Sequence, residues 1–117
     1  MFGIKRKTVF LCDDMNSYLH PKLYESIVRH FTSKEIQYSQ LIFNSHDILN
    51  MRSELFRRDE IWFVYRDENY SSVLIPLSNI VDFRGKQVRK DVVYSKQYLE
   101  GKFGFDPVII KDLKWYE

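Results

Sequence analysis

The sequence has few glycines, and their positions exclude one common phosphate-binding motif. Only 4 of the 117 residues are glycine. None of them belongs to a Gly-x-x-x-x-Gly-Lys-Ser/Thr loop, whose backbone N–H groups wrap nucleotide phosphates. Residues 3–8, Gly-Ile-Lys-Arg-Lys-Thr, contain a Lys-Thr pair but lack the second glycine. The sequence therefore provides no phosphate cradle of this type.

Cysteine pairs, long apolar runs and a strong net charge are also missing. The single cysteine, Cys12, allows no internal disulfide, and its place in an apolar run predicts a buried, inert thiol. No apolar run approaches the roughly 18 residues of a membrane-spanning helix, and no secretory signal follows the basic N-terminus. We therefore expect a cytoplasmic protein without a membrane partner. The net charge of +2 is too small to indicate a nucleic-acid partner by itself.

The composition is that of a chain with a real core. Of the residues, 44% are hydrophobic and 16% aromatic, and a length of 117 residues predicts a single domain over residues 1–117. Basic residues gather at Lys5 to Lys7, at Arg57-Arg58 and from Arg84 to Lys90. Such clusters are usually solvated surface, and otherwise they contact phosphates or nucleic acid.

Hydrophobic periodicity predicts alternating strands and helices. A helix should begin at Pro21, which suits a first helical turn, and end near Thr32-Ser33. The polar turn Asn44 to Asp47, with Ser45 or Asp47 as cap, should open a second helix. A last helix should end before Gly101. The expected strands cover residues 8–12, 40–43, 60–65 and 72–77. The apolar side of the second expected helix consists of Ile48, Leu49, Met51 and Leu55, and the last expected helix covers residues 93–99.

The third and fourth strands should pair as a hairpin, and Pro76 argues for an edge position. The apolar tail Val108 to Tyr116 should pack back on the body. The order of strand, helix and strand before this hairpin favours a right-handed βαβ arrangement and an α/β fold.

The stretch from Val9 to Cys12 is too short for a helix, and its apolar character predicts a strand buried on both faces. It ends in two acids, Asp13 and Asp14. In an open parallel sheet, ligands lie outside the carboxyl ends of the strands, where an acid can reach a metal or a phosphate. Taken alone, these residues favour the simpler interpretation of a buried strand with an acidic end.

Four longer motifs extend this pattern. Asp13-Asp14-Met-Asn-Ser-Tyr-Leu-His-Pro21 resembles the Walker B motif and D-loop of ABC-type ATPases. The loop Asn44-Ser-His-Asp47 follows the next strand at the spacing of that superfamily's switch histidine. Arg57-Arg-Asp-Glu-Ile-Trp-Phe63 and Tyr98-Leu-Glu-Gly-Lys-Phe-Gly104 resemble the C-terminal signatures of AAA-type, ABC-like ATPases of abortive-infection and other anti-phage systems. The resemblance covers about Val9 to Gly104.

The resemblance implies an α/β fold, namely a partial P-loop NTPase sheet with flanking helices and a C-terminal hairpin, and a site for ATP and Mg²⁺. It implies that Asp13 is the metal ligand, Ser17 a D-loop residue facing the partner subunit, and His46 the switch histidine. Asp14 stands where the family has its catalytic glutamate. The side chain of Asp14 is one methylene shorter, which sets its carboxylate farther from the water it would activate.

Since the family's P-loop lies upstream of Walker B, we expect the chain to be the C-terminal part of such an ATPase, either a truncated gene product or an excised segment. Its expected partners are a P-loop-containing half or a full-length ATPase, further copies of itself, and an effector nuclease or nucleic acid. Arg57 and Arg58 would pair with Asp59 or Asp67, or contact a partner.

Two alternatives remain at this stage. The chain is a stand-alone regulatory module that binds protein or nucleic acid with a degenerate ATPase fold, or it is an unrelated small α/β enzyme. In the second case Asp13, Asp14 and His46 would form a metal site.

Overall fold

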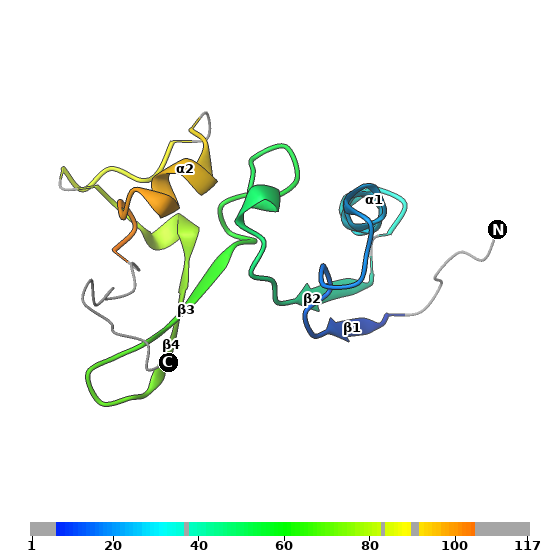
Figure 1. Cartoon of the computed structure of the whole chain (residues 1–117). Coiled ribbons are helices and arrows are strands. Elements are labelled where there is room, and N and C mark those ends of the chain that lie inside the picture. Colours follow the sequence, from blue (N-terminus) through cyan, green and yellow to red (C-terminus); the bar gives the residue numbers. More distant parts are fainter. Residues whose placement is uncertain (1–6, 37, 83, 90–91, 105–117) are drawn as a thin grey trace, which may run out of the picture. The chain divides into compact units, whose positions relative to one another are not determined.

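The computed structural model describes residues 7–36, 38–82, 84–89 and 92–104 (Figure 1). The chain divides after Arg57 into an N-terminal and a C-terminal unit, and each is described by itself. The single domain expected over residues 1–117 stays a prediction, and the expected packing of Val108 to Tyr116 lies outside the described residues. The N-terminal unit contains β1 (Val9–Cys12), α1 (Pro21–Thr32), β2 (Gln40–Phe43) and the 3-10 turn η1 (Ile48–Asn50); the C-terminal unit contains β3 (Trp62–Arg66), β4 (Ser72–Pro76), the 3-10 turn η2 (Leu77–Asn79) and α2 (Tyr94–Leu99).

The N-terminal unit is built on one parallel strand pair. β1 runs alongside β2 from Val9 opposite Gln40 to Cys12 opposite Phe43, and α1 forms the connection between them. This confirms the predicted adjacent parallel strands and the helix between them. The result is a small βα unit with both strands ending at the same edge.

Local signals fix both ends of α1. Nδ1 of His20 accepts a hydrogen bond from the backbone N–H of Lys22 at 3.2 Å, and Pro21 occupies the first helical turn, where its missing N–H costs nothing. At the other end, the hydroxyl of Ser33 donates to the carbonyl of His30 at 2.8 Å. The helix therefore begins and ends where the sequence predicts.

α1 covers one face of the sheet (Figure 1). Tyr24 and Val28 of the helix are buried, and so are Met15 and Leu55 from the flanking loops. The ring of Tyr24 meets the ring of Phe43 edge to face, with 5.7 Å between centroids. This cluster is the hydrophobic core of the N-terminal unit, and Cys12 is one of the half-buried residues at its margin.

The prediction that the first strand is buried on both faces is wrong. Side chains alternate along a strand, so those that do not point toward α1 lie on the opposite face. There Val9 is 58% exposed, Leu11 77% and Ile42 48%. Among the described residues of the N-terminal unit, α1 is the one helix on this two-stranded sheet, so that unit provides no element that covers the second side. We call Val9, Leu11 and Ile42 the uncovered face.

The prediction of a helix after the Asn44–Asp47 turn is also wrong, because only the short turn η1 forms there. Asp47 caps η1 as predicted, accepting from the backbone N–H of Leu49 at 3.0 Å. Its other oxygen accepts from the side chain of Asn50, and Met51 then leaves the helical region with φ −80° and ψ 78°. The cap therefore starts a single 3-10 turn that does not continue into an α-helix.

The C-terminal unit begins with an antiparallel hairpin. β3 pairs with β4 from Trp62 opposite Pro76 to Arg66 opposite Ser72. The carboxylate of Asp67 closes the turn by accepting from the backbone N–H groups of Asn69 and Ser71, both at 2.9 Å. The hairpin is therefore confirmed, with each strand within two residues of its predicted bounds.

Aromatic packing holds α2 to the hairpin. Leu77 and Tyr94 are fully buried, and Phe63 of β3 stacks on Tyr98 of α2 with 5.5 Å between ring centroids. Phe103 also packs against Phe63, with 5.6 Å between their ring centroids. After α2 the chain turns at Gly101, whose φ of +73° is accessible to glycine at little cost.

Neither helix among the described residues has the length and apolar character needed to cross a bilayer.

The buried phenol of Tyr24 predicts an alkaline weakness. Burial, with a smaller effect of the Asp47 carboxylate, raises the pKa of Tyr24 from 10.0 to about 12. Because the unfolded phenol ionises first, the stability contributed by the neutral form is complete below about pH 10 and is lost as pH rises toward about 12. Thermal melts across this range should show a smaller alkaline loss for Tyr24→Phe than for the wild type.

The matched control is Tyr18→Phe, since Tyr18 is 98% exposed. Its alkaline loss should equal that of the wild type. Equal alkaline losses in Tyr24→Phe and the wild type would show that Tyr24 is not the responsible group.

Candidate functional site

Two polar loops meet at the carboxyl edge of the parallel sheet. The first loop, residues 13–20, follows β1, and the second loop, residues 44–47, follows β2. Because the strands are parallel and in register from Val9 to Cys12, both loops leave the sheet at the same end. This is the edge where ligands bind in open parallel sheets.

The side chain of Asn44 joins the two loops. Its Oδ1 accepts from the backbone N–H of Asp14 at 2.5 Å, and its Nδ2 donates to Oδ1 of Asp13 at 2.7 Å. An amide side chain carries an acceptor oxygen and a donor nitrogen, so Asn44 can make both bonds at once. We call these two bonds the Asn44 bridge; it fixes one oxygen of the Asp13 carboxylate.

A second contact lies beside the Asn44 bridge. The hydroxyl of Ser45 donates to Oδ1 of Asn16 at 2.8 Å and accepts from the backbone N–H of Asp47 at 2.9 Å. The two loops are thus connected at two points, and the second loop is connected onward to the cap of η1. This double connection orders a segment that contains no helix or strand.

Asp14 has an unusual backbone conformation. Its φ of +53° lies in the left-handed region, which aspartate tolerates better than most residues other than glycine and asparagine. The carbonyl of Asp14 accepts from the N–H of Ser17 at 3.1 Å and closes a tight turn. The next residue, Met15, then enters the core with 6% exposure, so the turn separates the acidic edge from the apolar interior.

The structure places the four predicted catalytic, metal and cofactor residues on these two loops. Asp13, Asp14 and Ser17 are exposed on the first loop, and His46 is exposed on the second. Asp13 and His46 therefore lie outside the apolar core and at the same end of the sheet. Their assigned roles stay predictions.

The side chains at this edge fit a Mg²⁺ ion that would be held mainly by waters and substrate phosphates. Mg²⁺ usually keeps several waters and binds one or two carboxylates together with substrate phosphates. Asp13 presents one carboxylate, whose Oδ1 is held by the Asn44 bridge. No three His, Cys, Asp or Glu side chains within the described ranges are grouped to hold a metal by themselves. The alternative of a metal site made by Asp13, Asp14 and His46 therefore lacks support.

Arg58 has a structural role inside the C-terminal unit. Its guanidinium donates to the carbonyl of Val88, and its own carbonyl accepts from the N–H of Ser78 at 3.1 Å. Oδ1 of Asp67, one of the acids suggested as its partner, accepts from backbone N–H groups of the hairpin turn instead. Arg57 is exposed at the end of the N-terminal unit.

A second polar surface lies on the outer side of α1. Lys22, Glu25, Ser26 and Arg29 line an open hollow of about 350 Å³. Glu25 accepts from Arg29 at 2.7 Å and from Arg52 at 2.9 Å, and these bonds lower the pKa of its carboxyl. The pairing of Glu25 with two arginines makes this an ion-pair network at the helix surface.

Asn16 and Asn44 are the residues of the site to which the sequence motifs give no role. Ser45 is expected only as a helix cap, and in the second loop only His46 is expected to have a catalytic function. A residue pair 30 positions apart, such as Asn44 and Asp14, is brought together only by strand pairing. The available signal was the presence of an amide side chain in the loop after each apolar strand, Asn16 after β1 and Asn44 after β2.

Comparisons with known proteins do not extend this description. The chain matches no protein-family model, and it has no significant similarity to a curated protein or to a solved structure. What stands at the level of fold is a mixed α/β chain with a small parallel sheet and an antiparallel pair. The ATPase assignment rests on the motifs and on the geometry of the two loops.

Removing the Asn44 bridge should loosen the site and weaken the N-terminal unit. Asn44→Ala removes both hydrogen bonds, and at about 0.5–1.5 kcal/mol each the free energy of unfolding should fall by about 1–3 kcal/mol. Asn44→Asp removes the donor and places a second carboxylate beside Asp13, so it should be less stable than Asn44→Ala at neutral pH and recover on acidification. Denaturant unfolding measures both.

The control is Asn79→Ala, because Asn79 is an exposed asparagine of the C-terminal unit. It should change the unfolding free energy by less than about 0.5 kcal/mol. A neutral Asn44→Ala variant would mean that the Asn44 bridge does not hold the loops together.

Proposed function

We propose that the chain is the C-terminal ATPase segment of an ABC-like, anti-phage (abortive-infection) ATP-binding protein, and that it acts on ATP only when joined to a P-loop-containing half. The observation that carries the proposal is the meeting of the two loops. The first loop, with its two acids, and the second loop, with His46, lie at one edge of the parallel strand pair and are joined by the Asn44 bridge. The sequence motifs predict this arrangement.

The proposed roles follow from position and chemistry. Asp13 would hold Mg²⁺, which neutralises phosphate charge when bound. His46, exposed on the neighbouring loop, would contact the terminal phosphate, and Ser17 would face the partner subunit. Asp14 would orient the attacking water, although its shorter side chain reaches less far toward that water than the family's glutamate. The phosphate cradle, which supplies most of the affinity for nucleotide, would come from the other half.

An alternative is a stand-alone regulatory module that docks on a full-length ATPase or, through its basic loop, on nucleic acid. The missing cradle and the shortened acid at Asp14 favour it. The two functions differ in one measurable respect, because only a true ATPase segment contributes groups needed for turnover.

The isolated chain should show no measurable ATPase activity and at most feeble ATP binding. Co-expression with a P-loop-containing polypeptide encoded next to it should yield a complex that hydrolyses ATP. In that complex Asp13→Asn should lower the turnover rate by about 100-fold or more. The control is Glu35→Gln, an exposed acid-to-amide change in the same unit, which should leave the rate unchanged.

Two results would contradict this assignment. Turnover by the purified chain alone that disappears in Asp13→Asn would show that no second half is needed. An active complex indifferent to Asp13→Asn would favour the regulatory module instead.

We also propose that the isolated chain forms homo-oligomers through the uncovered face. Val9, Leu11 and Ile42 expose apolar area beside strand edges that have no partner strand among the described residues, and such edges readily pair with another chain. Light scattering should show a dimer or larger species as concentration rises. Leu11→Lys should shift it to monomer, whereas Leu49→Lys, at another exposed leucine (76%), should not. A clean wild-type monomer at high concentration would refute self-association.

A further inference from the structure

The C-terminal unit contains a well-ordered turn that carries basic residues. Val81 and Gln87 form an antiparallel bridge. Between them the N–H of Asp82 donates to the carbonyl of Lys86 at 2.8 Å, and the N–H of Gly85 donates to the carbonyl of Asp82 at 2.9 Å. We call the described residues 81–82 and 84–89 the basic turn, after the side chains of Arg84, Lys86 and Arg89.

The carboxylate of Asp82 holds the basic turn in shape. Its Oδ1 accepts from the backbone N–H groups of Arg84 and Lys86, at 2.8 and 2.9 Å. The bond from Lys86, followed by that from Arg84, lowers the pKa of Asp82, so the carboxylate stays ionised and bonded at neutral pH. The φ of +77° at Gly85 completes a conformation that most other residues would strain. The turn is therefore ordered before any ligand binds.

The basic turn is also anchored to the rest of its unit. The guanidinium of Arg58 donates to the carbonyl of Val88, directly before Arg89. This ties the outgoing strand of the turn to the start of the hairpin segment. A surface on such a framework loses little conformational entropy when it binds.

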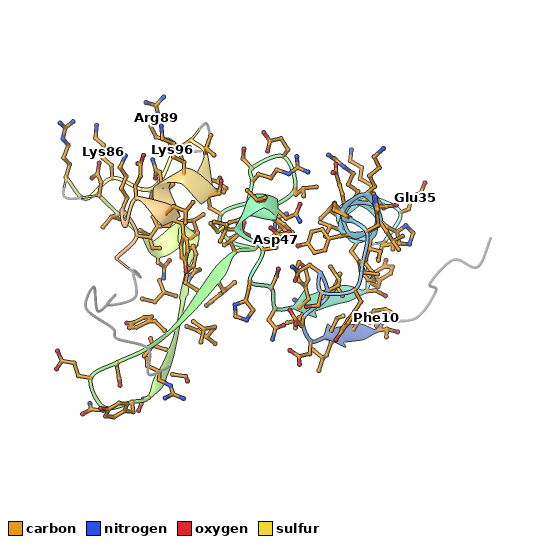
Figure 2. The ribbon with its side chains drawn as sticks, viewed as in Figure 1. Phe10, Glu35, Asp47, Lys86, Arg89 and Lys96 are labelled. Carbon is orange, nitrogen blue, oxygen red and sulfur yellow. The ribbon has the colours of Figure 1, made fainter. Side chains whose placement is uncertain are left out.

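Basic side chains around this turn outnumber acidic ones and face solvent. Figure 2 shows Lys86, Arg89 and Lys96 projecting to the same side of the C-terminal unit, and all three are exposed. The nearby carboxylates are already engaged. Asp82 bonds the backbone of the turn, and Glu100 pairs with Lys102 at 3.0 Å and with Lys96 at 3.9 Å.

We propose that Arg84, Lys86, Arg89 and Lys96 form a binding surface for the phosphate backbone of a nucleic acid. The cations come from an extended turn and a separate helix rather than from one enclosed pocket, which suits a chain of phosphates better than a single small anion. Arginine and lysine pair with phosphate oxygens through charge-assisted hydrogen bonds. Contacts of this kind position a backbone and read no base sequence.

The proposal fixes the character of the binding. Affinity should be in the micromolar range or weaker at physiological salt, as is usual for sequence-independent contacts. It should fall as salt rises, with a slope of log K against log salt of about −3 to −4 for a duplex, because about four cations each displace counterions. The surface belongs to the C-terminal unit alone, so it does not depend on the ATPase assignment.

The test is fluorescence anisotropy of the full chain with labelled DNA duplex, single-stranded DNA and RNA of mixed sequence, without ATP. The double variant Lys86→Gln/Lys96→Gln should bind about 10-fold more weakly at low salt, and its salt slope should be smaller by about 2. The matched control, Lys22→Gln/Lys34→Gln, removes the same charge from exposed positions of the N-terminal unit. It should stay within about twofold of wild type.

A further variant separates geometry from charge. Asp82→Ala removes a negative charge, so charge alone predicts tighter binding, whereas loss of the ordered turn predicts weaker binding. We expect weaker binding, and tighter binding would overturn the role of the ordered turn.

Three other results would overturn the nucleic-acid surface itself. They are equal losses in the two double variants, no binding by the wild type at low salt, and binding to vesicles containing anionic phospholipid with none to nucleic acid.

Discussion

The parallel pairing of β1 with β2 is the interaction on which the N-terminal unit depends. It requires a crossover, which α1 supplies, and it gives α1 an apolar surface to cover. It also brings the first loop and the second loop to one edge, where the side chain of Asn44 reaches both Asp13 and Asp14. Without this pairing the first loop and the second loop would not lie side by side.

The C-terminal unit is organised by different forces. Its hairpin and α2 are held by the stack of Phe63 on Tyr98 and by the buried Leu77 and Tyr94. Polar side chains are used there mainly to shape turns. Asp67 closes the hairpin and Asp82 closes the basic turn, each by accepting two backbone N–H groups. The exposed cations of this unit are therefore carried by turns that the Asp67 and Asp82 carboxylates hold through bonds to backbone N–H groups.

Sequence reasoning succeeded where the determining signals are local. Pro21 with His20 marks the start of α1, and Gly101 marks the turn after α2. It failed where the outcome depends on neighbours. The apolar run of β1 was expected to be covered on both faces, but Leu11 has no covering element among the described residues and stays exposed. The predicted second helix stops after the single turn η1, because the backbone leaves the helical region at Met51. The Asn44 bridge was out of reach because it joins residues 30 apart in sequence.

The left-handed backbone at Asp14 has a consequence for how this site can change. Aspartate is among the few residues that adopt a positive φ readily, whereas glutamate lacks the short side chain that bonds its own backbone there. In the role proposed for Asp14, a longer acid would bring its carboxylate nearer to the water but would fit this left-handed turn less well. An exchange of Asp14 for glutamate would therefore have to be combined with a redesign of residues 13–17 as one block. The conformation of the turn and the length of the acidic side chain at residue 14 therefore depend on each other.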